Sequence, residues 1–303
     1  MAAWSFAIIS DVHVYSSGKV PQDFTTVVAE LAAAQPRFVV VSGDATVGNP
    51  GDGVSDEKVG AWWIAFRAAL APLRQAGIPI LAIAGNHDYY TDAHRRGYVA
   101  AWADLAQDVQ SSGLGTLGGQ LPLSYALRVD DVFLLFLHTV DQKLEPEVEA
   151  YAQAALASDE ATTAALRLAI GHVPLVSMMG KTSETYRDRL GSLLVRGGVS
   201  AFFSGHEHLV WDQALAFEGG TLRQIHVGTA SGTYHYPLNA ATFDAYCQNG
   251  KGTLPFSGQV FSLLPGTRQQ ADKVTLAWVD VDGGSYDVRH LCLRDGHLVR
   301  FGQ

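Results

Sequence analysis

The sequence predicts an α/β protein with two packed β-sheets, and three observations carry that prediction. The first half alternates short apolar runs with amphipathic segments, which is the pattern of βαβ units and a parallel sheet. The second half is dominated by strand and turn patterns. No linker of shifted composition and no internal repeat divides the chain, so we expect residues 1–303 to form one domain.

The elements of the first half follow from apolar periodicity and from the residues at their ends. The apolar runs at 6–10, 38–42 and 78–84 are typical of buried strands. Helical periodicity covers residues 23–34, which Pro36 terminates, and residues 57–75, which Gly77 follows. The resulting βαβαβ order predicts right-handed crossovers in one sheet.

The remaining elements are expected from the same signals. A helix over 92–108 is followed by a Gly/Ser-rich loop over 111–120 and by a hairpin of strands at 123–129 and 132–138. Further on we expect helices at 145–157 and 183–195 and strands at 166–170, 199–204, 222–227, 274–281 and 286–293. We expect the strands of residues 209–301 to complete the second sheet.

Composition excludes several classes of protein. The chain is 48% hydrophobic and 17% charged, and 21 basic against 30 acidic residues give a net charge of −9. This balance disfavours a long nucleic-acid groove and a polybasic membrane surface. Two cysteines, Cys247 and Cys292, are too few for a disulfide framework or a four-thiolate zinc site, and they fit a reducing compartment.

No membrane or export signal is expected. No positive charge precedes the apolar run at the start of the chain, and Asp11 interrupts that run early, so we expect a core strand rather than a signal peptide. No uncharged apolar stretch reaches the length of about 18 residues that a membrane span needs. A cytoplasmic protein without a membrane span is the expectation, and its oligomeric state stays open.

Five short polar clusters follow predicted strands, most of them beside a glycine. In α/β sheets the loops beyond the carboxyl ends of strands converge on bound ligands, so we expect the clusters to share one site. Each cluster alone is a weak signal, because Gly-Asp and Gly-His are common turns. The five together are specific: Asp11-Val12-His13, Gly43-Asp44, Gly85-Asn86-His87-Asp88, Gly171-His172 and Gly205-His206-Glu207-His208.

Seven of these side chains are metal ligands by type. Their mixture of carboxylate, amide and imidazole groups suits manganese, iron or zinc better than calcium or magnesium. Seven ligands are too many for one catalytic zinc and suit two ions about 3.5–4 Å apart bridged by a carboxylate. The candidates are Asp11, His13, Asp44, Asn86, His172, His206 and His208.

The motifs DVH, GD, GNHD, GH and GHEH, in this order between residues 11 and 208, resemble those of the calcineurin-like metallophosphoesterase superfamily. The resemblance implies a four-layer α-β-β-α sandwich of two mixed β-sheets flanked by helices, with a dinuclear metal site. At the matching positions it implies a first ion on Asp11, His13 and His208 and a second on Asn86, His172 and His206, with Asp44 as the bridge.

The implied function is a metal-dependent phosphoesterase. It would hydrolyse a small phosphodiester or phosphomonoester by attack of a metal-bridging hydroxide. Mn²⁺ and/or Fe are the expected ions, with Zn²⁺ as the alternative. The resemblance assigns His87 to the substrate, to stabilise charge or protonate the leaving group, and Asp88 to orienting His87. A structural cap is the other reading of Asp88.

The sequence departs from two subfamilies. Purple acid phosphatases carry a tyrosine three residues after the bridging aspartate, and this chain has Val47 there, which argues against an iron–tyrosinate enzyme. Cyclic-nucleotide phosphodiesterases of the superfamily often carry arginine after GNHD, where this chain has Tyr89 and Tyr90. The resemblance therefore does not assign the substrate.

Several aromatic and basic residues are candidate substrate contacts. Tyr89 and Tyr90, with residues 94–96, follow the GNHD motif and could bind a second phosphate oxygen or a leaving group. Tyr234 and His235 could stack a base or an aryl leaving group, although packing of a long loop explains residues 233–246 equally well. We expect residues 94–96 to be a solvated helix start and His138 to be a core histidine. Three further histidines carry no motif and are expected to be structural: His226, His290 and His297.

Two alternative functions stay open. A nuclease of the same superfamily needs a basic channel, and the net charge of −9 counts against it. A catalytically inactive metal-binding interaction module would normally have lost a ligand or the catalytic histidine, and here every motif position is filled. A zinc metalloprotease is disfavoured, because His206-Glu207-His208 lacks the spacing of H-E-x-x-H.

Overall fold

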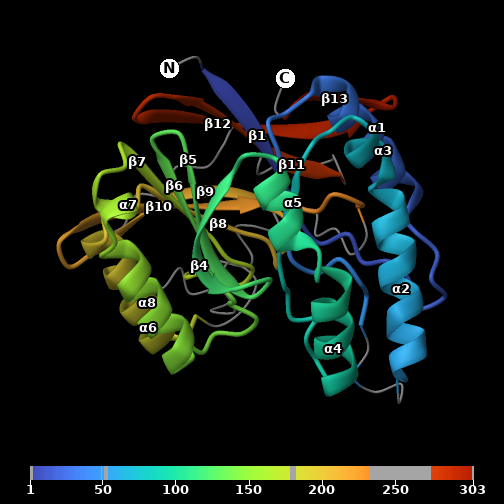
Figure 1. Cartoon of the computed structure of the whole chain (residues 1–303), viewed down its shortest axis with the longest axis horizontal. Helices are drawn as coiled ribbons and strands as arrows, with labels where there is room; N and C mark the ends of the chain where they lie inside the picture. The colour runs from blue at the N-terminus through green and yellow to red at the C-terminus, as the bar shows by residue number, and fades with distance from the viewer. Residues whose placement is uncertain (1–2, 49, 51–53, 178–181, 233–273, 302–303) are drawn as a thin grey trace, which may run out of the picture.

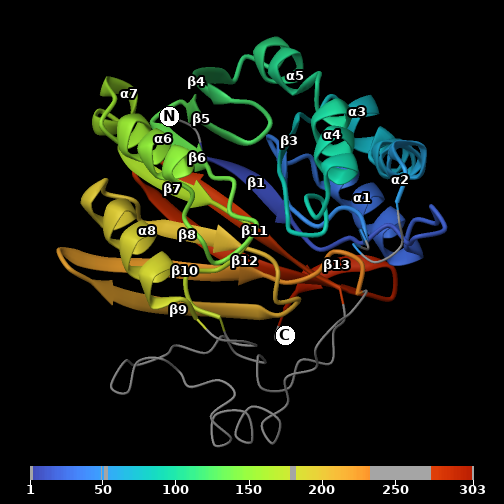
Figure 2. The ribbon, with the colours of Figure 1, turned by 90° about the horizontal axis from the view of Figure 1, so that it is seen from below.

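Two β-sheets pack face to face between two groups of helices (Figures 1 and 2). The computed structural model describes residues 3–48, 50, 54–177, 182–232 and 274–301. Within these residues the layers run helix, sheet, sheet, helix. The arrangement confirms the predicted four-layer sandwich of two mixed sheets.

The first sheet has the strand order β13-β12-β11-β1-β2-β3. Strands β1, β2 and β3 are parallel, as the βαβαβ pattern predicts, whereas β11 runs antiparallel to β1. In sheet order the strands span His297–Arg300, Ser285–Arg294, Thr275–Asp282, Trp4–Ile9, Val39–Ser42 and Ile80–Ile83.

The second sheet has the order β4-β5-β6-β7-β8-β10-β9. Its centre, from β6 to β10, is parallel, and antiparallel hairpins close both edges. In sheet order the strands span Gly115–Gln120, Ser124–Val129, Val132–Phe136, Leu166–Ile170, Ala201–Ser204, Gly220–Val227 and Val210–Phe217.

Helices cover the outer face of each sheet (Figure 2). The first sheet is covered by α1 (Gln22–Ala34), α2 (Asp56–Ala69), α3 (Ala71–Gln75), α4 (Asp92–Ala101) and α5 (Leu105–Ser111). The second is covered by α6 (Pro146–Leu156), α7 (Asp159–Thr162) and α8 (Glu184–Arg196). One buried cluster joins Val279 of the first sheet to Phe203 and Ile225 of the second, so the sheets share a core.

Two predicted helices are each two helices in the structure. Residues 57–75 divide at Leu70 into α2 and α3, because Pro72 has no N–H for a continuing helix and instead occupies the first turn of α3. Residues 92–108 divide at Trp102, whose backbone leaves the helical region at φ −113° and ψ 22° while its ring stays buried. Both breaks let the chain turn over the sheet.

Three strand predictions need correction. The loop expected over 111–120 contains the edge strand β4. Its Gly-rich sequence disfavours a strand, but the pairing with β5 stabilises it. Strands β9 and β13 were not individually expected. The strands of residues 209–301 do not all complete the second sheet: β9 and β10 do, whereas β11, β12 and β13 extend the first sheet from β1.

In the described part of the chain, no helix is both long and apolar enough to span a bilayer.

Candidate metal centre

The polar clusters found in the sequence lie together beyond the carboxyl ends of five strands. Parallel strands end at the same edge of a sheet, and the two packed sheets bring their edges together. The loops after β1, β2, β3, β7 and β8 supply, in that order, Asp11 with His13, Asp44, Asn86, His172, and His206 with His208.

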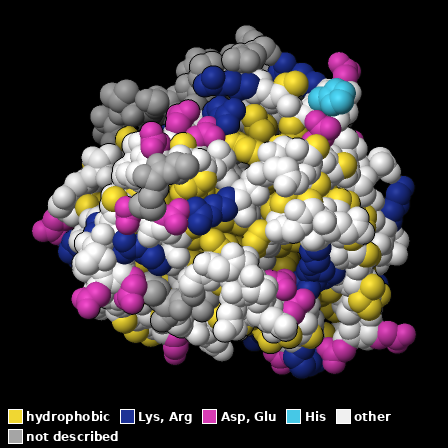
Figure 3. Space-filling view, turned by 45° about the horizontal axis from the view of Figure 1, so that its top comes forward, with side chains coloured by type: hydrophobic (Ala, Val, Ile, Leu, Met, Phe, Trp, Pro, Cys, Tyr) yellow, Lys and Arg dark blue, Asp and Glu magenta, His cyan; other side chains and the backbone are white. Residues whose placement is uncertain are grey.

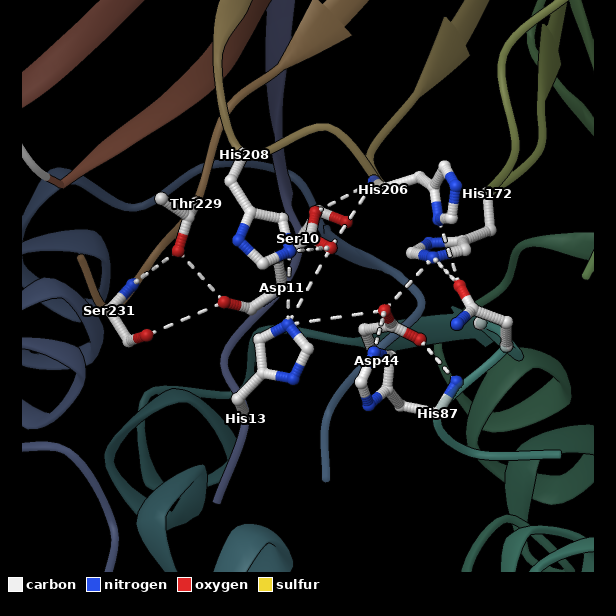
Figure 4. A network of polar contacts seen from close by, with 12 residues as sticks. Ser10, Asp11, His13, Asp44, His87, His172, His206, His208, Thr229 and Ser231 are labelled. Atoms are coloured by element: carbon white, nitrogen blue, oxygen red, sulfur yellow. Dashed lines mark hydrogen bonds and ion pairs between the residues drawn. The ribbon is translucent and has the colours of Figure 1, made fainter. Parts of the chain in front are cut away.

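The first cluster joins two carboxylates and two imidazoles. One ligand atom from each of Asp11, His13, Asp44 and His208 lies within 4.8 Å of the others. The Nε2 atoms of His13 and His208 are 3.2 Å apart, and His208 Nε2 is 3.2 Å from Asp11 Oδ1. Figure 4 shows the His208 ring above the His13 ring, with a nitrogen of each ring directed toward the Asp11 carboxylate. All four residues are buried.

The second cluster shares Asp44 with the first. Ligand atoms of Asp44, His172 and His206 lie within 4.8 Å of one another, with His172 Nε2 3.2 Å from Asp44 Oδ2. The amide of Asn86 joins them, since its Oδ1 is 3.2 Å from His172 Nε2 and 2.8 Å from His206 Nδ1. The seven predicted residues therefore form two groups with Asp44 between them (Figure 4).

Backbone groups fix the direction of these side chains. His172 Nδ1 donates to the Ser42 carbonyl at 2.8 Å, which leaves Nε2 facing Asp44. The backbone N–H of His206 donates to Asp11 Oδ2 at 3.0 Å. Thr229 Oγ1 donates to the Asp11 carbonyl at 2.8 Å and so supports the loop that carries Asp11. Sequence analysis missed Thr229, because a lone threonine carries no motif.

Five of the seven residues adopt a left-handed backbone. The φ values lie between 53° and 71° at Asp11, His13, Asp44, His206 and His208. Non-glycine residues reach this region at a cost of about 1–3 kcal/mol each, so the surrounding structure must hold them there. Concentrated backbone strain of this kind marks a functional site rather than a structural turn.

Glycines allow the motif loops to approach each other. A Cβ atom at Gly85 would overlap the Asp44 carboxylate, and one at Gly205 would overlap the side chains of Ser10 and Asp11. These two motif glycines are therefore required by the close approach of a neighbouring loop.

The electrostatics of the centre favour bound cations. Burial alone would raise the pKa values of Asp11 and Asp44, but His208 beside Asp11 and His172 beside Asp44 outweigh it and hold both pKa values below the ordinary one. In the described residues, the groups within 4 Å that could pair with either carboxylate are histidine rings, and one of them, His13, is neutral. Two buried carboxylates without a Lys or Arg partner fit positive ions.

Two of the four imidazoles in the ligand groups are neutral and ready to coordinate. Burial lowers the pKa of His13 to about 3 and that of His206 to about 4. Burial opposes protonation of His172 as well, but Asp44 outweighs it and raises the pKa to about 9. A metal ion at the second cluster must therefore displace one proton.

His87 lies at the edge of the centre and takes no part in the two ligand groups. Its Nδ1 donates to the carbonyl oxygen of Val47, and its Nε2 lies 3.9 Å from Asp44 Oδ2. The hydrogen bond to Val47 thus assigns the tautomer and turns Nε2 toward the shared carboxylate. The side chain is 28% exposed, which leaves it accessible to a substrate.

The expected pairing of Asp88 with His87 is wrong. The buried Asp88 carboxylate accepts hydrogen bonds from the backbone N–H groups of Gly85, Ala45 and Thr46, at 3.1, 3.2 and 3.1 Å, and from the Thr46 hydroxyl. Burial and the nearby Asp44 raise its pKa to about 6. Asp88 thus ties the loop after β2 to the loop after β3, and Val47 orients His87 instead.

The structure describes only some of the other candidate substrate contacts. Tyr89 is half-buried beside the centre, whereas Tyr234 and His235 lie outside the described residues. His94 is buried and bonded to Thr91 Oγ1 at 2.7 Å, so the expected solvated helix start applies to Arg95 and Arg96 alone. The three histidines expected to be structural lie outside both ligand groups: His226 and His290 are buried, and His297 is exposed.

The sequence profile of the calcineurin-like phosphoesterase family matches residues 5–210, which is more than half of the chain and includes all seven residues of the centre. The chain belongs to this family. Members of the calcineurin-like phosphoesterase family hydrolyse phosphoric ester bonds and use a dinuclear metal centre, and the two clusters that share Asp44 fit that centre.

Solved structures share the fold at low sequence identity. Purple acid phosphatase PPD1 from yellow lupin (Lupinus luteus) seeds is 14% identical with a TM-score of 0.62. That match covers 99% of this chain and 53% of the lupin chain, so this chain spans about half of the lupin protein. GAP50, the anchor in the inner membrane complex of Plasmodium, is 13% identical with a TM-score of 0.60, covering 99% and 87% of the two chains.

A dimetal phosphatase from Danio rerio is 12% identical with a TM-score of 0.52, and the match covers 75% of this chain and 87% of that one. At these identities the likeness concerns the fold alone. No curated protein matches this chain.

Proposed function

We propose that this calcineurin-like phosphoesterase hydrolyses a small phosphodiester or phosphomonoester at a dinuclear metal centre. The observation that carries the proposal is the position of Asp44, whose carboxylate belongs to both ligand groups. A first ion would be held by Asp11, His13 and His208, a second by Asn86, His172 and His206, and Asp44 would bridge them. The mixture of oxygen and nitrogen donors favours Mn²⁺ or Fe, with Zn²⁺ as the alternative.

Two bound ions would supply an activated water and neutralise charge on the phosphoryl oxygens. The chain's own contribution is to position the substrate and to move a proton. His87 Nδ1 keeps its proton on the Val47 carbonyl while Nε2 faces the centre. With a second proton on Nε2, His87 can donate a hydrogen bond to a phosphoryl oxygen or transfer that proton to the leaving alkoxide. Tyr89, beside the centre, would contact the group esterified to phosphorus.

The charges on one face of the molecule and the net charge favour a small substrate over a long nucleic acid. On the face shown in Figure 3, the Lys and Arg side chains of the described residues are scattered among Asp and Glu side chains and form no continuous band. A nuclease channel needs such a band to bind successive phosphates. With a net charge of −9 as well, nuclease activity is the weaker proposal.

An inactive interaction module is also the weaker proposal. The likeness to GAP50, described as an anchor, concerns the fold. Here each of the seven ligand positions and the His87 position is filled by a residue able to do the chemistry.

We further propose that the described elements form one domain, because β11 pairs with β1 and Thr229 supports Asp11.

The test is reconstitution of the metal-free protein with Mn²⁺ or Fe²⁺, followed by metal analysis and hydrolysis of bis(4-nitrophenyl) phosphate and 4-nitrophenyl phosphate. Two ions per chain, and turnover that a chelator abolishes, are expected. Fewer than one ion per chain would refute the dinuclear centre. Two ions without turnover of any phosphoester would favour the inactive module.

A further inference from the structure

A cavity of about 490 Å³ opens beside the second ligand group. Asn86 and His206 form one of its walls, so it is continuous with the proposed metal centre. The other walls come from the loop after β3, the start of α4 and the loops after β6 and β7. A phosphoester bound at the centre would therefore place part of its organic group in this cavity.

Two tyrosine rings line the cavity and are held in place by their neighbours. The Tyr89 ring lies edge-on to His138 at 4.3 Å between centroids, and the Arg95 guanidinium lies over it at 5.2 Å. The Tyr90 ring is 4.9 Å from the His87 ring. Rings fixed in this way stack on a planar ligand with little loss of side-chain freedom.

The charges of the cavity suit an uncharged group. Arg95 is the cation among its described lining residues, and Arg95 Nη1 already lies 3.2 Å from Asp92 Oδ1. Asp141 adds a negative charge to the same wall. A second phosphate is normally bound by a bidentate arginine or by several cations free to pair with it, and this cavity provides neither.

One edge of the cavity can form directional hydrogen bonds. Asp141 Oδ1 accepts from the backbone N–H of Lys143 at 2.9 Å, and Oδ2 remains as an acceptor. Gln142 Oε1 accepts from the backbone N–H of Ser183, so the amide orientation is fixed, with the Nε2 donors unused by the described residues. A carboxylate acceptor beside an amide donor matches the edge of a nucleobase.

We infer that this cavity binds the base of a nucleoside phosphoester, with the ring against Tyr89 and Tyr90 and its edge on Asp141 and Gln142. The inference rests on the proposed function, because the ester itself lies at the metal centre. In this arrangement Gln142 and Asp141 determine which ester binds, and the residues of the metal centre carry out the hydrolysis.

The first test compares two diesters with the same leaving group. Thymidine 5′-(4-nitrophenyl) phosphate and methyl 4-nitrophenyl phosphate differ only in the group that the cavity would receive. With the Mn²⁺-loaded protein we expect a KM about 10-fold lower or more for the nucleoside diester, since stacking of one base contributes that much affinity. Equal KM values for the two diesters would overturn the inference.

The second test is Gln142→Glu, which keeps an oxygen for Ser183 N–H and removes the amide donors. We expect the variant to lose most of the KM advantage of the nucleoside diester and to hydrolyse the methyl diester as before. The matched control is Gln153→Glu, the same change at an exposed position of α6. Loss of activity toward both diesters alike would show a structural effect and overturn the specificity role.

A binding measurement separates this inference from the proposed function. Calorimetric titration of the metal-loaded protein with thymidine 5′-monophosphate and with methyl phosphate needs no turnover. Tighter binding of the nucleotide, reduced by Gln142→Glu, supports the cavity even if hydrolysis fails. Equal binding of both ligands refutes the cavity even if hydrolysis succeeds.

Discussion

The backbone N–H of His87 donates a 2.8 Å hydrogen bond to Asp44 Oδ1. That bond leaves Oδ2 to face the ligand groups, 3.2 Å from His172 Nε2 and 3.9 Å from His13 Nε2. The loop that carries the proposed catalytic histidine therefore sets the angle of the proposed bridging carboxylate. Positioning of His87 and metal binding are coupled through a single side chain.

Asp44→Asn should disrupt both functions of that carboxylate. The variant loses the negative charge between the two ligand groups, so we expect fewer than two ions per chain and at least about a 100-fold loss of turnover. Metal analysis and steady-state kinetics measure both effects. Asp287→Asn, the same change at an exposed position on β12, serves as the control and should behave as the wild type.

His87→Ala should separate chemistry from metal binding. His87 belongs to neither ligand group, so the metal content should stay at two ions, while kcat falls by about 10²–10⁴-fold, the usual range for a general acid. His297→Ala, at an exposed position on β13, is the matched control. Unchanged kcat in the His87 variant would remove the catalytic role.

Tyr90→Phe should weaken the second metal position. Asn86 Nδ2 donates to the Tyr90 hydroxyl at 3.1 Å, which turns Oδ1 of the same amide toward His172 and His206. Loss of an orienting partner typically lowers metal affinity by about 10–100-fold. Calorimetric titration with Mn²⁺ should show one weakened site and one unchanged site. Tyr89→Phe keeps both affinities, since the Tyr89 hydroxyl has no such bond in the described residues.

Metal binding should release a proton at neutral pH. In the metal-free protein, Asp44 raises the pKa of His172 to about 9, so this imidazole is charged at pH 7.5. That charge stabilises the metal-free fold below the ordinary histidine pKa of about 6.5, and the contribution disappears as the pH rises through 9. Metal affinity should increase as the pH rises toward 9, because His172 then has less often a proton to lose.

Calorimetry at pH 7.5 in two buffers of different ionisation enthalpy measures this release. About one proton per chain is expected from His172, and none from His13 and His206, which are already neutral there. Identical binding enthalpies in the two buffers would contradict the prediction.

Gly85→Ala should lower both stability and metal content. The added methyl group overlaps the Asp44 carboxylate, and overpacking of a buried site costs about 1–3 kcal/mol. Chemical denaturation and metal analysis give the two readouts. Gly60→Ala is the control, because the same atom meets open space on α2, where alanine should stabilise the helix by about 0.5–1 kcal/mol.

The sequence predicted the ligand set better than the contacts that orient it. Asp11, Asp44 and His208 stand in recognisable motifs after buried strands, and a strand end defines where its next residues point. The partner of His87 could not be found in this way. Asp88 is adjacent in sequence, but its carboxylate points to the loop after β2, and the orienting group is a backbone carbonyl, that of Val47, which any residue could supply.

The same limit applies to the sheets. Periodicity predicted strands at 274–281 and 286–293 nearly as observed, because alternation and turn residues are local signals. It did not predict which sheet they join. Strand β11 lies beside β1, and that pairing links residues more than 270 positions apart, as Ser5 and Asp280 show. Local patterns carry no information about such a partner.

The amino-acid sequence by itself therefore determined the α/β class, most of the strands and helices, and the motifs whose side chains can hold two metal ions. The resemblance of the motifs also implied that Asp44 is the bridge. Tertiary structure alone decided that Val47 orients His87, that Asp88 joins two loops, and that Tyr90 and Gln142 line one cavity. The physical reason is the sequence separation over which each signal acts. Propensity and periodicity act over a few residues, whereas a shared carboxylate, a buried hydrogen bond and a cavity arise only when distant loops pack together.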